Sequence, residues 1–168
     1  MYQNKDHTNQ KHIVTKSNNI DITDQKSLLE ITRKLSKLVS QGDNLFLYGE
    51  LGVGKTTFVR NFINQLQYLN KINLIEVLSP TFSILNEYEI NNLNVKHYDL
   101  YRVKRKEELD NLGLFEEKNA INIIEWPEML VSYKIKIIKF NFSYSENFEN
   151  RNLIISSNYK NKIVDGFK

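Results

Sequence analysis

The feature that most constrains this chain is a glycine-rich loop that ends in a lysine and two threonines, GELGVGKTT at residues 49–57. Residues 44–48, NLFLY, form a short apolar run of the kind found in buried strands. Residues 56–66 place their apolar side chains at helical spacing. Strand, glycine loop and helix, in this order, are the context in which such a loop holds phosphate groups. A glycine-rich turn with a surface lysine is the alternative, but it does not explain the flanking elements.

Each residue type in this loop has a physical role. Glycines let successive backbone N–H groups converge on phosphate oxygens, and the helix that follows adds its unpaired amides. Lys55 supplies a movable cation, and the Thr56 hydroxyl is a ligand suited to Mg²⁺. The residues expected to bind the nucleotide are Gly49, Leu51, Gly52, Val53, Gly54, Lys55, Thr56 and Thr57. The loop therefore predicts a nucleoside triphosphate bound with Mg²⁺.

A loop of this type needs a carboxylate for the metal at the end of a neighbouring buried strand. The best candidate is Glu125, which ends the apolar run at residues 120–126. We therefore predict Thr56 and Glu125 as the metal-binding residues. Trp126 is either a core residue or a cover over the site, and its residue type alone favours the core.

A second strand end is predicted at HYDLYR, residues 97–102. Asp99 there could orient the attacking water or a metal-bound water. For an isolated aspartate the simpler explanations are a helix cap or a surface ion pair. Only the expected position of Asp99 near the loop favours a catalytic role.

The sequence disfavours GTP as the nucleotide. Residues 70–73, NKIN, resemble the guanine-specific N-K-x-D element but lack its aspartate and come too early in the chain. Residues 110–113 spell D-x-x-G, but no apolar strand leads into them. ATP is therefore the expected nucleotide.

The remaining pattern indicates a single α/β domain over residues 1–168, with residues 1–15 as a flexible tail. Thr23 or Asp24 is expected to cap a helix that continues as far as Gly42, and residues 72–78 are expected to form a short strand. The apolar residues of the predicted helix are Leu28, Ile31, Leu35, Leu38 and Val39.

The last third of the chain predicts a β-hairpin. Apolar residues alternate at 133–137 and then alternate in the opposite phase at 138–144, which implies a bulge or bend between the two segments. Residues 152–156 are the expected return strand. The predicted fold is thus a three-layer P-loop NTPase-like α/β fold, with a mixed, mostly parallel sheet and a C-terminal antiparallel hairpin.

Composition limits the remaining possibilities. The 168 residues include no cysteine, which excludes disulfides, thiolate metal sites and a cysteine nucleophile. No apolar run is long enough to cross a bilayer, and residues 1–12 lack the apolar segment of a secretory signal, so we expect a cytoplasmic protein without membrane contact. His7 and His12 are more simply solvated residues than metal ligands. The net charge of +3 is compatible with an acidic partner such as RNA, but scattered basic residues are more simply a solvated surface.

Four motifs together resemble the TsaE (YjeE) family. They are LYGELGVGKTT, SPTF, HYDLYR and IIEWPE, and they occur in the family's order. The resemblance as a whole runs from about Thr23 to Ser156. A P-loop alone would be generic, whereas the combination of DLYR and EWP is specific. Val53, where the family commonly has alanine, is a mild departure at a position that acts through its backbone.

The resemblance implies a function and adds roles to the residues. The family is a Mg²⁺-dependent ATPase, slow alone and regulated by partners, that assists threonylcarbamoyladenosine formation at position 37 of tRNAs that decode ANN codons. Its members work with TsaB and TsaD, so homologues of these proteins are the expected partners, and tRNA is reached indirectly through their complex. By the same resemblance, Asp99, Lys55 and Glu125 are catalytic, Thr81 belongs to a switch-like segment, and Trp126 lies near the nucleotide. Arg151 matches, more loosely, an arginine that contacts ATP.

Two other functions remain open at the level of sequence. A small-molecule or nucleotide kinase also uses a P-loop, and Arg102 and Arg105 could belong to a lid that closes over phosphates. A non-catalytic ATP-binding adaptor is the second alternative. The presence of every expected phosphate and metal group argues against a decayed site.

Overall fold

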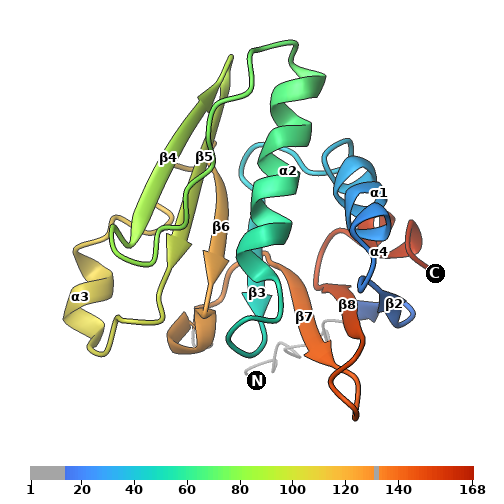
Figure 1. Cartoon of the computed structure of the whole chain (residues 1–168). Helices are drawn as coiled ribbons and strands as arrows, with labels where there is room; N and C mark the ends of the chain where they lie inside the picture. Colours follow the sequence, from blue (N-terminus) through green and yellow to red (C-terminus); the bar gives the residue numbers. More distant parts are fainter. Residues whose placement is uncertain (1–13, 131–132) are drawn as a thin grey trace, which may run out of the picture.

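The computed structural model describes residues 14–130 and 133–168 (Figure 1). Within these residues, the strands are β1 Thr15–Lys16, β2 Ile20–Asp21, β3 Asn44–Tyr48, β4 Leu85–Ile90, β5 Leu93–Asp99, β6 Ile121–Glu125, β7 Ile138–Tyr144 and β8 Arg151–Ser157. The helices are α1 Gln25–Leu35, α2 Lys55–Leu69, α3 Lys106–Asp110, the 3-10 helix η1 Pro127–Leu130 and α4 Asn161–Asp165. Of the predicted tail, Thr15 is the first residue of β1. His7 and His12 lie outside the described residues.

The strands form one mixed sheet in the order β1-β8-β7-β3-β6-β5-β4, with β2 also paired to β8. At its centre β3 runs parallel to β6 and β7, and β5 runs parallel to β6. The antiparallel pairs involve β4 and β8, so within the described residues only these two strands run against the others. The predicted α/β fold with a mixed, mostly parallel sheet and a C-terminal hairpin is confirmed.

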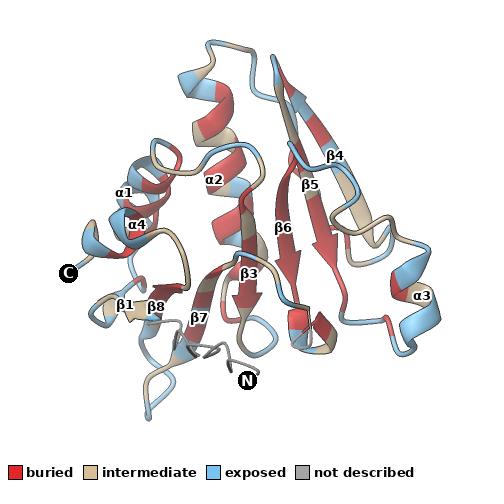
Figure 2. Cartoon of the chain, turned by 180° about the vertical axis from the view of Figure 1, so that it is seen from behind, coloured by how far each residue is buried: buried red, intermediate tan, exposed pale blue. Residues whose placement is uncertain are grey.

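Alternation along the strands supplies apolar side chains to both faces of the sheet. In β3, Leu45 and Leu47 belong to one hydrophobic core and Phe46 belongs to the other. The long helices α1 and α2 cover the first face, whereas α3, η1 and neighbouring loop segments cover the second. The central strands β3 and β6 are accordingly almost wholly buried (Figure 2).

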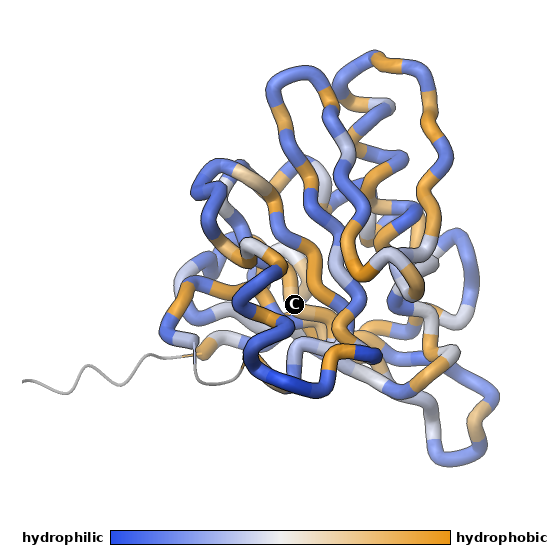
Figure 3. The backbone as a smooth tube through the Cα atoms, turned by 90° about the vertical axis from the view of Figure 1, so that its left-hand side faces the viewer, coloured by the Kyte–Doolittle hydropathy of each residue, from blue (hydrophilic) through white to orange (hydrophobic). Residues whose placement is uncertain are grey.

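Polar and apolar residues follow each other closely along the helices, as Figure 3 shows. Across residues 14–130 and 133–168, no helix is long and apolar enough to span a membrane.

Helix α1 is shorter than the sequence predicts. It ends at Leu35, and the backbone N–H groups of Lys37 and Leu38 then donate to carbonyls three residues earlier, at 3.3 and 2.9 Å. This tight turn ends the helix before Gly42, yet it still packs Leu38 and Val39 against the core. The apolar spacing therefore predicted the buried residues correctly but not the end of the helix.

Two predicted strands do not form. In both segments, side chains from elsewhere in the chain, rather than a neighbouring strand, form hydrogen bonds with the backbone. In residues 72–78 the Ile75 N–H donates to the Gln67 side chain at 3.2 Å, and no strand forms. In residues 133–137 the Asn158 side chain accepts from Ile137 N–H at 3.1 Å and donates to the carbonyl of Ile135 at 3.3 Å. Strand β7 begins only at Ile138, so the change of phase needs no bulge.

Candidate nucleotide site

The glycine loop connects β3 to α2 with a backbone that only glycine adopts easily. Gly54 precedes the first residue of α2 with φ of 112°, and Gly49 has φ of 140°. A Cβ atom on Gly49 would lie 2.7 Å from the carbonyl oxygen of Phe142 in β7. The loop therefore packs against the neighbouring strand and directs the amino end of α2 toward the site, which favours anions there.

A cavity of about 170 Å³ lies beside this loop, at the carboxyl ends of the parallel strands β5 and β6. Its lining residues are Leu51, Gly52, Gly54, Lys55, Thr56, Thr57, Thr81, Asp99, Glu125 and Trp126. Every one of them is a residue that the sequence predicted for the site. Residues distant in sequence meet here because β5 and β6 are parallel neighbours, with Asp99 in register with Glu125.

Lys55 is buried in the wall of this cavity, with an exposed fraction of 4%. Its ammonium donates to the carbonyls of Gly49 at 2.6 Å and Glu50 at 2.9 Å, and it lies 3.7 Å from the centroid of the Trp126 ring. A lysine ammonium has three N–H donors, so one more bond is available for an anion. Burial lowers the pKa of Lys55, and the nearby carboxylates, Glu125 foremost, partly oppose this shift.

Glu125 is held by two side chains from different elements. Thr56 donates its hydroxyl to Oε2 at 3.0 Å, and His97 Nε2 lies 2.9 Å from Oε1. An ionised carboxylate only accepts hydrogen bonds, so Nε2 carries the proton in this pair. His97 is fully buried, and its Nδ1 has no hydrogen-bond partner within the described residues. Both oxygens of Glu125 are therefore fixed in orientation.

Asp99 connects the site to the SPTF segment. Thr81 donates its hydroxyl to Asp99 Oδ2 at 2.8 Å, and the hydroxyl of Ser79 lies 2.8 Å from that of Thr81. The other oxygen, Oδ1, accepts from the backbone N–H of Tyr101 at 3.0 Å, a local turn of the kind that aspartate favours. Asp99 thus closes a turn with one oxygen and fixes Thr81 with the other.

Trp126 forms a half-buried wall of the cavity. Its backbone has φ of 58°, and its N–H donates to the carbonyl of Leu47 at 3.2 Å. The ring contacts Tyr101, with centroids 4.9 Å apart, as well as Lys55. Trp126 therefore has both of the expected positions, because it packs against the second core and also lines the cavity.

Three predicted site residues do not line the cavity. The carbonyl of Gly49 accepts a hydrogen bond from Lys55, and Val53 is fully buried in the core. Arg151 is exposed at the start of β8, with its guanidinium 5.9 Å from the ring centroid of Tyr144. The Tyr144 hydroxyl in turn lies 3.5 Å from the position of a Cβ on Gly52. Arg151 is thus near the outer side of the loop but is not brought to the cavity.

The sequence analysis missed two residues that support the site, His97 and Ser79. His97 precedes Asp99 by two positions on the same strand, so both side chains point to the same face. That spacing was the available signal. Ser79 belongs to the SPTF motif, but that motif alone did not indicate its contact with Thr81, which forms in an irregular segment.

The donor set fits Mg²⁺ held together with phosphates. Thr56 and Glu125 offer hard oxygen atoms within one hydrogen bond of each other. Among the residues that the structure describes, no group of three or more His, Cys, Asp or Glu side chains is arranged to hold a metal by itself. A metal in this cavity would therefore depend on oxygens of the nucleotide and water for the rest of its coordination.

Known proteins resemble this chain in sequence and in fold. A family model described as "Threonylcarbamoyl adenosine biosynthesis protein TsaE" matches residues 22–153. Curated proteins named tRNA threonylcarbamoyladenosine biosynthesis protein TsaE include one from Rickettsia felis, 41% identical over 106 residues, and one from Haemophilus influenzae, 29% identical over 157 residues. The first match covers 60% of this chain and 60% of the relative, and the second covers 87% and 94%.

The matched part thus spans about 60% of the length of the Rickettsia relative. A crystal structure of YdiB from Bacillus subtilis superimposes with a TM-score of 0.70 and 23% identity, over 93% of this chain and 96% of that one. This second comparison supports the fold. Because the family model covers residues 22–153 of 168, the chain belongs to the TsaE family.

Proposed function

We propose that this chain is a Mg²⁺-dependent ATPase that assists threonylcarbamoyladenosine synthesis on tRNA. The observation that carries the proposal is the cavity in which Lys55, Thr56, Asp99 and Glu125 meet at the end of the parallel strands. A buried cation, a hydroxyl–carboxylate pair and a second carboxylate are the groups that phosphoryl transfer to water requires. The family to which the chain belongs directs that activity to tRNA modification.

In this proposal each residue has a defined task. The loop amides and Lys55 bind the β- and γ-phosphates and neutralise charge that develops during transfer. Thr56 and Glu125 would hold Mg²⁺, which would supply further charge neutralisation when bound, and His97 keeps Glu125 in place. Asp99 accepts a hydrogen bond from the attacking water and so fixes its direction. Trp126 packs over the Lys55 ammonium and limits access of bulk water.

Control by partners follows from how Asp99 is held. Its Oδ2 is bonded to Thr81, which lies in an irregular segment rather than in a strand or helix. A partner that moves this segment would release or reorient Asp99, and hydrolysis would change without any change in the P-loop. We therefore propose slow turnover by the chain alone, with homologues of TsaB and TsaD as the regulating partners and resetting of their complex as the outcome.

The kinase alternative receives no support from the arginines that suggested it. Arg102 stacks on the Phe82 ring, with its guanidinium 4.3 Å from the centroid, and Arg105 pairs with Glu108 at 2.7 Å. Neither residue lines the cavity. ATP hydrolysis therefore remains the preferred reaction.

The test is steady-state release of phosphate from ATP. It is measured with the chain alone and with TsaB and TsaD homologues from the same organism, with and without tRNA, in Mg²⁺ and in EDTA. We expect slow turnover that rises with the partners and is lost in EDTA. Turnover that ignores the partners, or that requires a small acceptor and phosphorylates it, would contradict the proposal.

A further inference from the structure

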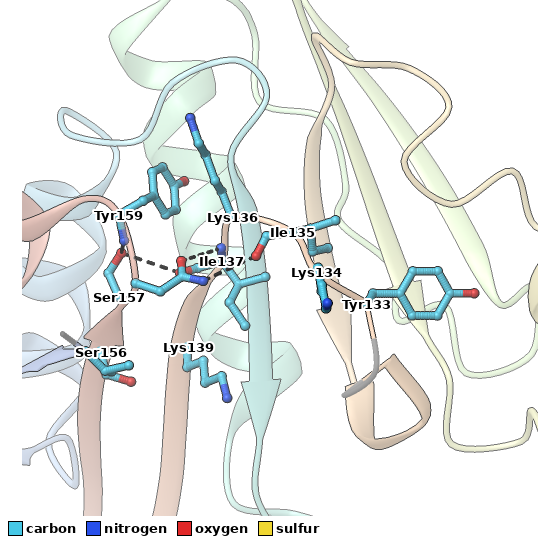
Figure 4. Close-up of a pocket in the computed structure, with 11 residues that line it drawn as sticks. Tyr133, Lys134, Ile135, Lys136, Ile137, Lys139, Ser156, Ser157 and Tyr159 are labelled. Atoms are coloured by element: carbon cyan, nitrogen blue, oxygen red, sulfur yellow. Dashed lines mark hydrogen bonds between the residues drawn. The ribbon is translucent and has the colours of Figure 1, made fainter. Parts of the chain in front are cut away.

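A second and larger cavity, of about 690 Å³, lies at the other end of the parallel strands (Figure 4). Its walls are residues 133–137, the beginning of β7 and the end of β8. Strand β7 connects the two ends of the molecule, because it begins at this cavity and ends at Tyr144, beside the P-loop glycine Gly52. We refer to this second site as the lysine cavity, since Lys134, Lys136 and Lys139 line it.

The three lysines have no carboxylate partner within 4.0 Å among residues 14–130 and 133–168. Two of them lie near aromatic rings instead. Lys136 Nζ is 5.8 Å from the centroid of Tyr159, and Lys139 Nζ is 5.7 Å from that of Tyr48. Three ammonium groups on one cavity, none neutralised by the described residues, create a positive potential that attracts an anion.

Hydrogen bonds between side chains and backbone hold the walls of the lysine cavity in place. The Asn158 side chain ties Ile135 and Ile137 to the end of β8 through two hydrogen bonds, and Ser157 adds a longer one, at 3.4 Å, to the carbonyl of Ile137. On the opposite wall, the Tyr159 hydroxyl donates to the buried Asp43 at 2.7 Å, which fixes its ring. The walls therefore exist before any ligand arrives.

The directions of the lysines indicate the shape of the ligand. In Figure 4, Lys136 and Lys139 point to opposite ends of the cavity. Ammonium groups that diverge do not enclose one phosphate, but they suit successive charges along an extended polyanion. The Tyr159 ring lies beside Lys136 at one end of the cavity, and bases stack on such rings in proteins that bind single strands.

We propose that the lysine cavity binds a single-stranded segment of RNA through its phosphodiester groups. The chain's own amino-terminal segment is a poor occupant, because residues 1–13 contain two lysines and only one aspartate. An acidic peptide would satisfy the lysines but would make no use of the Tyr159 ring. This site goes beyond the proposed ATPase function, since it gives the chain a direct contact with RNA at a place separate from the nucleotide cavity.

The experiment compares two variants that lose the same charge. In the test variant, Lys134, Lys136 and Lys139 are replaced by Gln. In the control variant, the exposed residues Lys26, Lys37 and Lys106, which also lack ion pairs within the described structure, are replaced by Gln. Binding of a fluorescein-labelled oligouridylate of about twelve nucleotides is followed by anisotropy over a series of salt concentrations.

We expect the test variant to bind the oligonucleotide at least about tenfold more weakly, and the salt slope of log K to fall by about 2, as the loss of three phosphate contacts requires. The control variant should retain most of the affinity. Equal losses of affinity in both variants would mean that RNA binding depends only on net charge, and this would overturn the proposal. Polyglutamate that competes with the oligonucleotide and depends equally on the three lysines would overturn it in favour of an acidic protein partner.

Titration of an ATP analogue separates this proposal from the ATPase proposal. Both lysine variants should bind the analogue with unchanged affinity, because the three lysines of the cavity lie apart from the nucleotide site. Loss of RNA binding with nucleotide binding intact supports the lysine cavity. Absence of hydrolysis in a chain that still binds RNA through these lysines would overturn the ATPase proposal alone.

Discussion

The two ends of the sheet hold cavities of opposite character. At the carboxyl ends of the parallel strands the cavity is small, and its buried polar side chains are paired with one another, as in Thr56–Glu125–His97 and Thr81–Asp99. At the other end the cavity is about four times larger, 690 against 170 Å³, and its lysines have no charged partner in the described residues.

The difference fits the functions proposed for the two ends. Side chains that act on a reacting group must be held in one geometry, and mutual hydrogen bonds in a buried site provide that constraint. Side chains that attract a flexible polyanion need charge and access more than a fixed position. The comparison predicts that substitutions at the first end change nucleotide chemistry, whereas substitutions at the second change RNA binding or stability.

The largest effect is expected from Asp99→Ala. Removal of the group proposed to orient the attacking water should lower kcat by a factor on the order of 10² or more, while nucleotide affinity changes little. Phosphate release under saturating ATP and a separate titration of an ATP analogue measure the two quantities. Asp110→Ala, an exposed change at the end of α3, is the matched control. Hydrolysis that survives Asp99→Ala unchanged means that the role assigned to Asp99 is wrong.

Lys55→Ala is expected to act on binding. Charge-assisted hydrogen bonds contribute about 1.5–3 kcal/mol, so loss of this ammonium should weaken nucleotide affinity by a factor between about 10 and about 150. Calorimetric titration with an ATP analogue measures the loss, and Lys37→Ala on the surface controls for net charge. If affinity is retained, Lys55 does not contact the phosphates, and the contrast between the two ends loses its main support.

His97→Leu should have a smaller and more specific effect. Without the hydrogen bond from Nε2, Glu125 keeps only the bond from Thr56, and supporting residues of this kind change metal affinity about tenfold or more. The Mg²⁺ concentration for half-maximal activity should rise, with a smaller change in kcat at saturating Mg²⁺. His97→Gln, which restores a donor, should recover part of the Mg²⁺ affinity. A uniform loss in kcat without a change in Mg²⁺ dependence would indicate a merely structural histidine.

His97 also illustrates why some of the site was predictable and some was not. Local patterns specified β3, α2 and the strand end at Glu125, and these elements carry the loop and the pair proposed to bind the metal. The pairing of His97 with Glu125 depends on the register of β5 against β6, and one sequence does not contain that register explicitly. The motifs therefore located the loop and the strand ends, but they did not reveal that further residues of the same motifs, His97 and Ser79, support the site.

The wrong strand predictions have the same physical cause. Residues 72–78 and 133–137 have strand-like composition, but long-range bonds from Gln67 and Asn158 decide their backbone. The lysine cavity was hidden for a related reason. Its lysines looked like part of a scattered positive charge until the end of β8 was placed beside residues 133–137. Contacts between segments distant in sequence, rather than local propensity, decided each of these features.

The smallest effect is expected from Tyr159→Phe, at the end that holds the lysine cavity. Burial raises the pKa of Tyr159, and the hydrogen bond to Asp43 raises it further, so the hydroxyl stays protonated and donates throughout the neutral range. Removal of this donor should lower the free energy of unfolding by about 1 kcal/mol, since Asp43 keeps its bonds to Lys160 Nζ and the backbone N–H of Ser40. Urea denaturation measures the change.

The same variant decides whether the two ends act separately. The phenylalanine ring keeps the aromatic wall of the lysine cavity, so RNA binding should persist, and nucleotide affinity should match that of the unmodified chain. A lower nucleotide affinity in Tyr159→Phe would mean that the ends are coupled, and β3 is the physical route, because Asp43 directly precedes it and the P-loop directly follows it. In that case a ligand in the lysine cavity would influence ATP binding, and by thermodynamic linkage ATP would influence the ligand by the same factor.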